Sequence, residues 1–356
     1  MSHKKAVLLI GYDSNLSLGV IYCLRSFNYT IHLLTSNQKN AARHSRFLDK
    51  IHVREAINST DDIIKIVQEN HIDLIMPIDE IEIRFVRQHK ELLSQYAPCS
   101  WSTDTEFFDI GINKKLLAEF LTKNGVSCPV YATVNDLEEL ENIAGQIGYP
   151  LLLKPTRGSF GRMIRKFENW EDLKNYYNSN PPEDREFIIQ PFIVGSDITC
   201  NVICKEGEII CYTIQESPVK TGSDFSSNDV LQFHEDEEVI REVGKMMKLL
   251  HWSGVACVDL RRDQRDKKVY ILEINGRFWA SVVTSCLKAK VNFPLIMLKL
   301  ALNEPVDIPK QTHGRQIALK QYFDALKSGK KTSFKDTKYV SYLSDPVARF
   351  FQVFKL

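Results

Sequence analysis

The sequence lacks the features that mark several classes of protein. No apolar run comes near the roughly 20 residues that a membrane-spanning helix needs, and residues 7–10 are too few for the core of a secretory signal. No internal repeat or low-complexity segment is visible. The net charge is only +1, from 46 basic and 45 acidic residues, so no overall field favours nucleic acid or a membrane as the partner. Any chemistry that depends on charge must therefore be local.

The eight cysteines are scattered along the chain and contain no CxxC pair. Cys200 and Cys204 can share one face of a strand, but no cluster of His or Cys nearby completes a zinc site. Most of the cysteines stand in apolar runs, which favours reduced and buried thiols. This usage predicts a cytoplasmic protein.

Two common nucleotide-binding motifs are also missing. Gly11 and Gly19 are too far apart for the G-x-G-x-x-G turn of a dinucleotide-binding fold, so a dehydrogenase is disfavoured. The glycine-rich stretch near Gly158 lacks the G-x-x-x-x-G-K-[ST] order, and no helix is expected after it, so it is not a Walker loop.

At 356 residues, with 44% hydrophobic and 26% charged residues, the chain has the length of two or three domains and an ordinary globular composition. Its first part alternates buried-type strands with apolar-periodic helices, which predicts an α/β domain with a doubly wound parallel sheet, Rossmann-like, over residues 1–105. The predicted elements are strands at 5–10, 30–35 and 74–77 and helices at 20–27, 61–70 and 85–93.

Polar residues follow two of these strands. Ligands of open α/β sheets bind beyond the carboxyl ends of the strands, which places residues 11–14 and the pair Asp79 and Glu80 at one edge of the sheet. These residues are candidates for contact with a small substrate. Ordinary capping of the loops is the alternative.

The most informative stretch is 252–281. Apolar, β-rich runs at 255–260 and 269–274 flank a charged loop at 261–268, which predicts a β-hairpin. If the two strands pair symmetrically about Asp266, two acidic residues come to lie opposite each other.

These acids are Asp259 and Glu273, and Asn275 shares the face of Glu273. Like charges that face each other across a sheet are destabilising unless something neutralises them. Carboxylate and amide oxygens are also the ligands that Mg²⁺ takes in proteins. The alternative is a surface hairpin with acids that are solvated or paired with Arg261, Arg262 and Lys267.

A second motif follows the strand predicted at 151–153, which ends in Lys154. The loop after it holds Gly158, Ser159 and Gly161. Glycines let backbone N–H groups approach phosphate oxygens, and a lysine at the end of a strand supplies a fixed positive charge. The motif indicates phosphate binding, and a plain hairpin turn with a solvated lysine is the alternative.

Two further residues complete the set of candidates. Lys114 stands in the first turn of an amphipathic helix for which Asn113 is the expected N-cap. Asp197 stands near the start of a strand predicted at 198–204, where it can accept hydrogen bonds from hydroxyl groups.

In this order the motifs resemble the ATP-grasp superfamily of carboxylate-activating ligases, over about 113–302. The region before them resembles the domain that precedes ATP-grasp in biotin carboxylase, carbamoyl phosphate synthetase and D-alanine:D-alanine ligase. The resemblance implies an α/β and α+β chain in which a two-subdomain ATP-grasp fold occupies 106–310, with a lid subdomain at about 125–190. Residues 311–356 are expected to form a tail with an amphipathic helix packed on the body, with partner docking or membrane-surface binding as the alternative.

The resemblance also implies a nucleotide site. Its residues are Lys114, Lys154, Gly158, Ser159, Gly161, Gln190, Phe192, Ile193 and Asp197. The lysines match those that hold the α- and β-phosphates of ATP, and the glycines match the lid. Gln190, Phe192 and Ile193 are expected beside adenine and Asp197 beside ribose, although the family more often has acidic residues and glutamate at the positions of Gln190 and Asp197.

Asp259, Glu273 and Asn275 match the family's Mg²⁺ ligands, with Mn²⁺ as an alternative ion. Arg277, in E-I-N-G-R-F, matches the E-x-N-x-R form of the carbamoyl phosphate synthetase-like branch, where the arginine stabilises the acyl phosphate. Arg277 and Lys154 are therefore the expected catalytic residues. Cys257 stands where the D-alanine ligase branch has an arginine, which favours the first branch.

The function that the resemblance implies is an ATP- and Mg²⁺-dependent ligase that activates a carboxylate as an acyl phosphate for attack by an amine or a thiol. The alternatives are an enzyme that phosphorylates bicarbonate or formate, and a nucleotide-binding module without ligase activity. The expected partners are small carboxylate and amine substrates, and a homodimer is an open option because many relatives dimerise.

Overall fold

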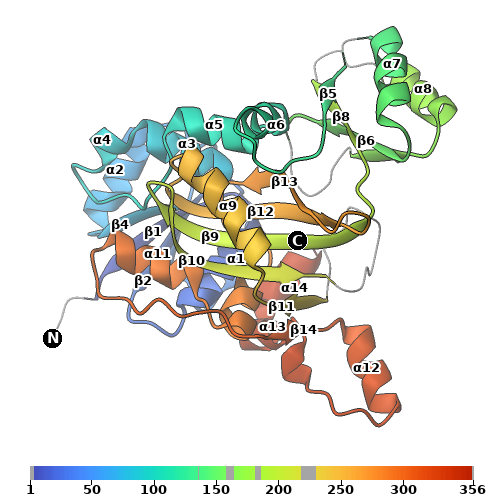
Figure 1. Ribbon diagram of the computed structural model, residues 1–356. Helices are drawn as coiled ribbons and strands as arrows, with labels where there is room; N and C mark the ends of the chain where they lie inside the picture. Colours follow the sequence, from blue (N-terminus) through green and yellow to red (C-terminus); the bar gives the residue numbers. More distant parts are fainter. Residues whose placement is uncertain (1–3, 135, 158–163, 181–185, 218–229, 355–356) are drawn as a thin grey trace.

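The computed structural model describes residues 4–134, 136–157, 164–180, 186–217 and 230–354. Three β-sheets organise these residues, and helices cover their faces (Figure 1). This mixed arrangement confirms the predicted fold class. Within the described ranges no helix combines the length and the apolar character needed to cross a membrane.

The N-terminal sheet is parallel, with strand order β3-β2-β1-β4. Both of its faces are buried: Val7 and Leu9 pack in one hydrophobic core with α1 and α11, while Leu8 and Ile10 pack in another core with α2. Two covered faces are typical of a doubly wound sheet. The elements are β1 Ala6–Ile10, α1 Ser14–Leu24, β2 Thr30–Thr35, η1 Ala41–His44, β3 Lys50–Val53, α2 Thr60–Glu69, β4 Leu74–Pro77, α3 Glu80–Gln88 and α4 Lys90–Leu93.

Helix α1 differs from its prediction, because it begins at Ser14 and not at residue 20. The carboxylate of Asp13 caps the helix by accepting hydrogen bonds from the backbone N–H groups of Asn15 and Leu16. Leu16 is almost fully buried and anchors the first turn. The prediction began the helix too late because Ser, Asn and Gly residues in this segment are weak helix formers.

A six-stranded antiparallel sheet with the order β13-β12-β9-β10-β11-β14 forms the centre of the molecule. Val202 and Ala256 face α9, whereas Ile203 and Val255 face the core that includes the N-terminal sheet. The elements of this part are α5 Thr105–Ile112, α6 Lys114–Lys123, β9 Gly195–Lys205, β10 Glu208–Glu216, β11 Leu231–Phe233, α9 Glu237–Leu249, β12 Gly254–Asp263, β13 Val269–Asn275 and β14 Arg315–Gln316.

A smaller antiparallel sheet, with strand order β5-β8-β6-β7, extends from the body with α7 and α8 (Figure 1). Its core contains Leu140, Leu151, Leu173 and Ile189. The backbone N–H of Lys114 donates to the carbonyl of Thr156 at 2.8 Å, which ties this sheet to the start of α6. The elements are β5 Ala132–Thr133, α7 Leu137–Ile147, β6 Leu151–Pro155, β7 Arg165–Phe167, α8 Trp170–Ser179 and β8 Phe187–Pro191.

The C-terminal segment returns to the N-terminal part of the molecule. In α14, Ala348 and Arg349 are buried, and the ring of Phe351 stacks on His44 at 3.8 Å. Helix α12 has no buried residue and projects away from the body (Figure 1). The elements are α10 Val282–Thr284, the π-helical turn η2 Ser285–Ala289, α11 Phe293–Ala301, α12 Leu319–Lys327, η3 Phe334–Asp336, α13 Val340–Ser344 and α14 Pro346–Phe354.

Gly254 at the start of β12 allows the β12–β13 hairpin to approach the N-terminal part closely. Its φ is +95°, and a Cβ at this position would lie 2.4 Å from the carbonyl oxygen of Trp101. We expect Gly254→Ala to lower the free energy of unfolding by about 2–4 kcal/mol. An alanine would be strained at this positive φ, and its methyl group would clash with the carbonyl oxygen of Trp101. Urea unfolding measures the change.

The matched control is Gly145→Ala in α7, where a Cβ would meet nothing within 4 Å. We expect this variant to gain about 0.5–1 kcal/mol from helix propensity. A Gly254→Ala protein as stable as the wild type would contradict the constraint.

Candidate active site

The predicted hairpin is present, and its register is the expected one. Strands β12 and β13 pair antiparallel with Asp259 opposite Glu273, and Thr199 of β9 lies on the other side of Asp259. A bulge beyond Asp259 shifts the pairing, so that Leu260 faces Ile271. Strand β12 continues through Asp263, which makes the connecting loop shorter than predicted.

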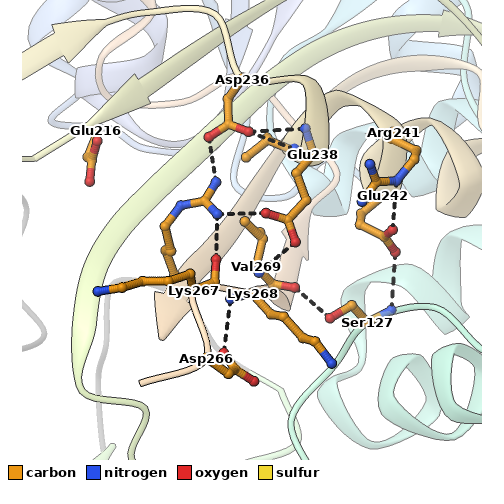
Figure 2. A network of polar contacts seen from close by, with 12 residues as sticks. Ser127, Glu216, Asp236, Glu238, Arg241, Glu242, Asp266, Lys267, Lys268 and Val269 are labelled. Atoms are coloured by element: carbon orange, nitrogen blue, oxygen red, sulfur yellow. Dashed lines mark hydrogen bonds and ion pairs between the residues drawn. The ribbon is translucent and has the colours of Figure 1, made fainter. Parts of the chain in front are cut away.

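The outer end of the hairpin is fixed to α9 by a separate set of charges (Figure 2). The guanidinium of Arg262 donates to Asp236 and Glu238, each at 2.6 Å, and Lys268 N–H donates to Asp266. Arg261 forms an ion pair with Asp197 at 2.9 Å. Both arginines therefore pair with other acids. The alternative in which they pair with Asp259 and Glu273 is wrong.

The two hairpin carboxylates contact a compact group of polar side chains. Glu273 Oε2 lies 2.8 Å from Nζ of Lys114, a residue of α6 with only 7% of its side chain exposed. Asp259 accepts hydrogen bonds from Thr199 Oγ1 and Asn275 Nδ2, both at 3.2 Å. Arg277 Nη2 in turn donates to Asn275 Oδ1 at 3.3 Å. Asp259, Glu273, Asn275, Lys114 and Arg277 therefore meet in space.

The pKa values of both carboxylates are shifted from their ordinary values. Burial, together with the negative charge of Glu273, raises the pKa of Asp259 to about 8. Burial also opposes the charge of Glu273, but Lys114 and then Lys154 outweigh it and lower the pKa of Glu273. Although 21% of the side chain of Glu273 is exposed, protein charges surround it closely enough to control its ionisation. Without a cation, the pair therefore holds one proton at neutral pH.

This arrangement predicts a stability gain on removal of one carboxylate. A pKa of about 8 in the folded state, against 3.8 as the ordinary value, means that folding stability falls as pH rises between these two values. We expect Asp259→Asn to unfold like the wild type near pH 4 and to be more stable by about 1–2 kcal/mol at pH 8. Urea unfolding as a function of pH, without divalent ions, measures the difference.

Asp266→Asn in the hairpin loop is the control with the opposite sign. The N–H of Lys268 and the hydroxyl of Tyr270 lower the pKa of Asp266, so its charge favours the folded state above the ordinary pKa. We expect this variant to lose stability at neutral pH. If the Asp259→Asn protein also lost stability at pH 8, the negative charge of Asp259 would not destabilise the folded state.

Lys154 stands near the end of β6 with 5% of its surface exposed. Burial lowers its pKa to about 8, and Lys114 and Arg261 add to the effect while Glu273 opposes it. A buried lysine that lacks a full counter-charge favours an anionic ligand. Gly158, Ser159 and Gly161, predicted in the loop after this strand, lie outside the described residues.

A cavity of about 450 Å³ lies between the small sheet and the central sheet. Nine of the predicted residues line it, and Lys114 adjoins it through Glu273. Those nine are Lys154, Gln190, Phe192, Ile193, Asp197, Asp259, Glu273, Asn275 and Arg277. Its volume falls in the range of cofactor and ligand sites, so one ligand can touch both the lysine and the carboxylates.

Gln190, Phe192 and Ile193 line the cavity. Gln190 is 3% exposed, and its Oε1 accepts no hydrogen bond from the described residues. A buried acceptor without a donor costs free energy until a ligand supplies the donor. An amino group of a flat heterocycle beside Phe192 would supply it.

The sequence prediction missed Arg261, which lies in the cavity and is only 6% exposed. Its guanidinium carbon lies 4.6 Å from the centre of the Phe192 ring, and its Nε has no hydrogen-bond partner among the described residues. In the structure Asp197 is paired with the guanidinium of Arg261. The signal was available: Arg261 stands two residues after Asp259, on the same face of β12.

Glu80 also lies closer to the cavity than the sequence predicted. Predicted only at the edge of the N-terminal sheet, it approaches Arg277, with Glu80 Oε1 3.8 Å from Arg277 Nε. Burial raises the pKa of Glu80, while Arg277 lowers it. Asp79 beside it accepts hydrogen bonds from the N–H groups of Tyr12 and Asp13, which fixes the first loop. The N-terminal edge therefore reaches the cavity at Arg277.

The donor set fits a divalent cation of the Mg²⁺ type. Two close carboxylates that hold a shared proton are suited to exchange it for a metal ion. The amide nitrogen of Asn275 faces Asp259 and its oxygen faces Arg277, so the amide must turn over before its oxygen joins the carboxylates. In the part of the chain that the structure describes, no group of three or more His, Cys, Asp or Glu forms a metal site. A site here would depend on further oxygens from the ligand.

Comparisons with known proteins agree with this geometry. Residues 112–281 match the family model described as an ATP-grasp domain. The large chain of carbamoyl phosphate synthase from Pseudothermotoga lettingae is 23% identical over 299 residues, which cover 78% of this chain and 26% of that protein. The chain thus spans about a quarter of that relative's length.

Two solved structures share the fold. The L-amino acid ligase from Bacillus licheniformis has a TM-score of 0.63 at 18% identity, covering 85% of this chain and 75% of that one. The biotin carboxylase domain of 2-oxoglutarate carboxylase from Hydrogenobacter thermophilus, solved with MgADP, ADP and bicarbonate, has a TM-score of 0.67 at 18% identity, covering 88% and 72%.

A parallel sheet followed by two antiparallel sheets around a charged cavity is the architecture of this chain, and its fold is similar to that of the two solved structures. The match over residues 112–281 identifies that segment as an ATP-grasp domain.

Proposed function

We propose that the protein is an ATP- and Mg²⁺-dependent ligase that joins a carboxylate to an amine through an acyl phosphate. The observation that supports this most is the convergence of Lys154, Asp259, Glu273 and Arg277 on one cavity, with Lys114 bound to Glu273. This set holds the opposite charges that a nucleoside triphosphate and its metal ion need.

ATP is the proposed nucleotide substrate, because the cavity offers a contact for each of its parts. Gln190 would accept from the amino group of adenine, and Phe192 and Ile193 would pack on the ring. Asp197, paired with Arg261, would accept from ribose. Lys154 and Lys114 would neutralise the phosphates. Asp259, Glu273 and a reoriented Asn275 would hold Mg²⁺, which supplies charge neutralisation at the transferred phosphoryl group.

The chemistry divides into two steps. A carboxylate oxygen of the first substrate attacks the γ-phosphorus, the bond between that phosphorus and the bridging oxygen breaks, and ADP leaves. The amine then attacks the acyl carbon, phosphate leaves with the electron pair of its C–O bond, and the nitrogen loses a proton. Arg277 lies where its guanidinium can stabilise negative charge in both steps, because Phe278, Asn275 and Glu80 hold it from separate sides.

Bicarbonate is a second candidate for the carboxylate. The support is the similarity to carbamoyl phosphate synthase large chains and to the biotin carboxylase domain solved with bicarbonate. The same residues would act on it, since bicarbonate also presents an oxygen nucleophile to the γ-phosphorus.

ADP release in the presence of Mg²⁺ tests the proposal, with amino acids and small carboxylates supplied in pairs and with bicarbonate as a separate arm. A ligase releases ADP only when both partners of one pair are present. Bicarbonate-dependent release without an amino acid would favour the second candidate. Calorimetric binding of ATP with no ADP release in any arm would support a binding module and overturn both.

A further inference from the structure

The end of α1 and the segment after the β12–β13 hairpin bring two cysteines together. Cys23 lies in the last turn of α1, and Cys286 lies in the π-helical turn η2. The amide nitrogen of Asn292 donates to the carbonyl of Cys23 at 2.8 Å, and a Cβ on Gly19 would lie 3.0 Å from Cγ1 of Val282. The two segments therefore pack closely, although 259 residues separate Cys23 from Val282.

The thiol of Cys23 faces the segment that contains Cys286. Its Sγ donates to the carbonyl oxygen of Val282 at 4.0 Å. Cys286 follows Val282 by four residues, and residues four apart lie on the same side of a helical segment. The thiol of Cys286 accordingly shares a hydrogen bond with that of Cys23. Both side chains pack in the same hydrophobic core.

The two thiols differ in exposure. Cys23 is 1% exposed, whereas Cys286 is only partly buried. A small solute can therefore reach Cys286, while the surrounding core shields Cys23. All eight cysteines lie within the described ranges, and Cys128 is the other one that is partly buried. Cys128 therefore serves as a reference for the reactivity of Cys286.

The two thiols also differ in ionisation. The hydrogen bond from Cys23, together with the positive charges of Arg25 and Lys290, lowers the pKa of Cys286, although burial opposes the charge. Burial raises the pKa of Cys23. Burial also raises the pKa of each of the six other cysteines. Since the thiolate is the reactive form of cysteine, Cys286 is the nucleophile of the pair and Cys23 is the neighbouring thiol.

We propose that Cys23 and Cys286 form a reversible disulfide when a hydroperoxide oxidises the protein. An accessible thiolate beside a second thiol is the usual arrangement of redox-sensitive cysteine pairs. The disulfide would join α1 to the segment that supplies Ala280 and Ser281 to the cavity of the candidate active site. The proposal does not depend on the proposed function, because neither thiol lines that cavity.

The oxidation divides into two steps. The thiolate of Cys286 attacks one oxygen of the hydroperoxide, the O–O bond breaks, and the leaving oxygen takes up a proton, which leaves a sulfenic acid on Cys286. The sulfur of Cys23 then loses its proton and attacks Sγ of Cys286, the S–O bond breaks, and hydroxide leaves as water. Two electrons pass from the thiols to the peroxide. A soluble dithiol reverses the change by thiol–disulfide exchange.

Hydrogen peroxide added to the native full chain tests the pair. Free thiols are then blocked with iodoacetamide, and the non-reduced peptides are identified by mass spectrometry. We expect a cross-linked Cys23–Cys286 peptide, lighter than the two reduced peptides by two hydrogen atoms and lost after treatment with dithiothreitol. Cys286 that stays unmodified by peroxide, or a sulfenic acid on Cys286 that does not proceed to the disulfide in the wild type, would overturn the proposal.

Three variants separate the roles of the thiols. Cys23→Ala removes the second thiol, so peroxide should leave a sulfenic acid on Cys286, which dimedone traps. Cys286→Ser removes the nucleophile and should leave Cys23 reduced. Cys128→Ser is the matched control and should form the disulfide like the wild type. Oxidation of Cys23 in the Cys286→Ser protein, or loss of the disulfide in the Cys128→Ser protein, would contradict the proposal.

The rate of alkylation tests the nucleophile in the wild type, before any oxidant is added. At pH 7 we expect iodoacetamide to modify Cys286 about 10-fold faster than Cys128, because the thiolate is more populated at Cys286. Equal rates would contradict the assignment of Cys286 as the nucleophile. Since the cross-link and these rates are measured in the wild type, they test the pair even if a variant fails to fold.

Discussion

Replacement of Glu273 by Gln should reduce MgATP turnover by about 10³-fold or more. Glu273 carries the negative charge of the carboxylate pair, because the lysines around it keep it ionised while Asp259 holds the proton. The glutamine removes that charge and leaves Lys114 without its partner at 2.8 Å. Both the affinity for a divalent cation and the position of Lys114 should therefore be lost. Steady-state ADP release measures the first effect, and Mn²⁺ titration by electron paramagnetic resonance measures metal affinity directly.

The same change also tests folding, since removal of one partner of a buried ion pair can cost about 3–5 kcal/mol. Glu273→Asp separates the two effects, because it keeps the charge but shortens the reach to Lys114. We expect it to fold and to retain weak Mn²⁺ binding with low turnover. Glu208→Gln removes a carboxylate of the same sheet that pairs with Lys248 at the surface and should leave turnover unchanged. A folded Glu273→Gln protein with wild-type Mn²⁺ affinity would show that the metal is held elsewhere.

The hairpin is the part of the site that the sequence predicts best. Its strands are rich in β-branched and aromatic residues, and a period of two residues decides which side chains share a face. Symmetric pairing about Asp266 is enough to bring Asp259 opposite Glu273, and the bulge begins only beyond that pair. Local rules suffice here because both acidic residues belong to one hairpin.

Other parts of the site depend on packing between distant segments. Glu80 reaches Arg277 because the N-terminal sheet packs against the central sheet, and no local pattern encodes that contact. Arg261 was missed despite its spacing from Asp259, because a charged residue near the end of a strand is more often solvated than buried. Its burial follows from Asp197 and Phe192, which stand more than 60 residues earlier in the chain.

Charge balance explains why these residues tolerate one another. Lys114, Lys154, Arg261 and Arg277 are four buried cations around the cavity, against the carboxylates of Asp197, Asp259, Glu273 and Glu80. Burial, with a smaller contribution from Lys114 and Arg261, lowers the pKa of Lys154, and burial together with Glu273 raises the pKa of Asp259. Both shifts oppose the charged form of the group, and a metal ion beside Asp259 together with an anion beside Lys154 would counteract them.

Arg277→Lys should lower the rate constant for ADP release by about 10²-fold while the KM for ATP changes little. Arg277 is 8% exposed and is oriented by the carbonyl of Phe278 at 2.8 Å, by Asn275 and by Glu80. Such a fixed fork can hold two oxygens of a developing phosphoryl group, whereas a lysine places one flexible charge there. In the proposed site the nucleotide would contact Lys154 and Gln190, which also line the cavity, so its affinity should survive the change.

The informative control for Arg277→Lys is Arg262→Lys on the same hairpin. Arg262 binds Asp236 and Glu238 at the start of α9 and does not line the cavity. Its replacement should cost about 1 kcal/mol of stability and leave the rate constant unchanged. Because the two arginines share one hairpin, equal kinetic losses would mean that hairpin stability limits turnover and that Arg277 has no role in the transition state. A selective loss at Arg277, with the KM for the carboxylate rising more than that for ATP, would place its guanidinium at the reacting carboxylate.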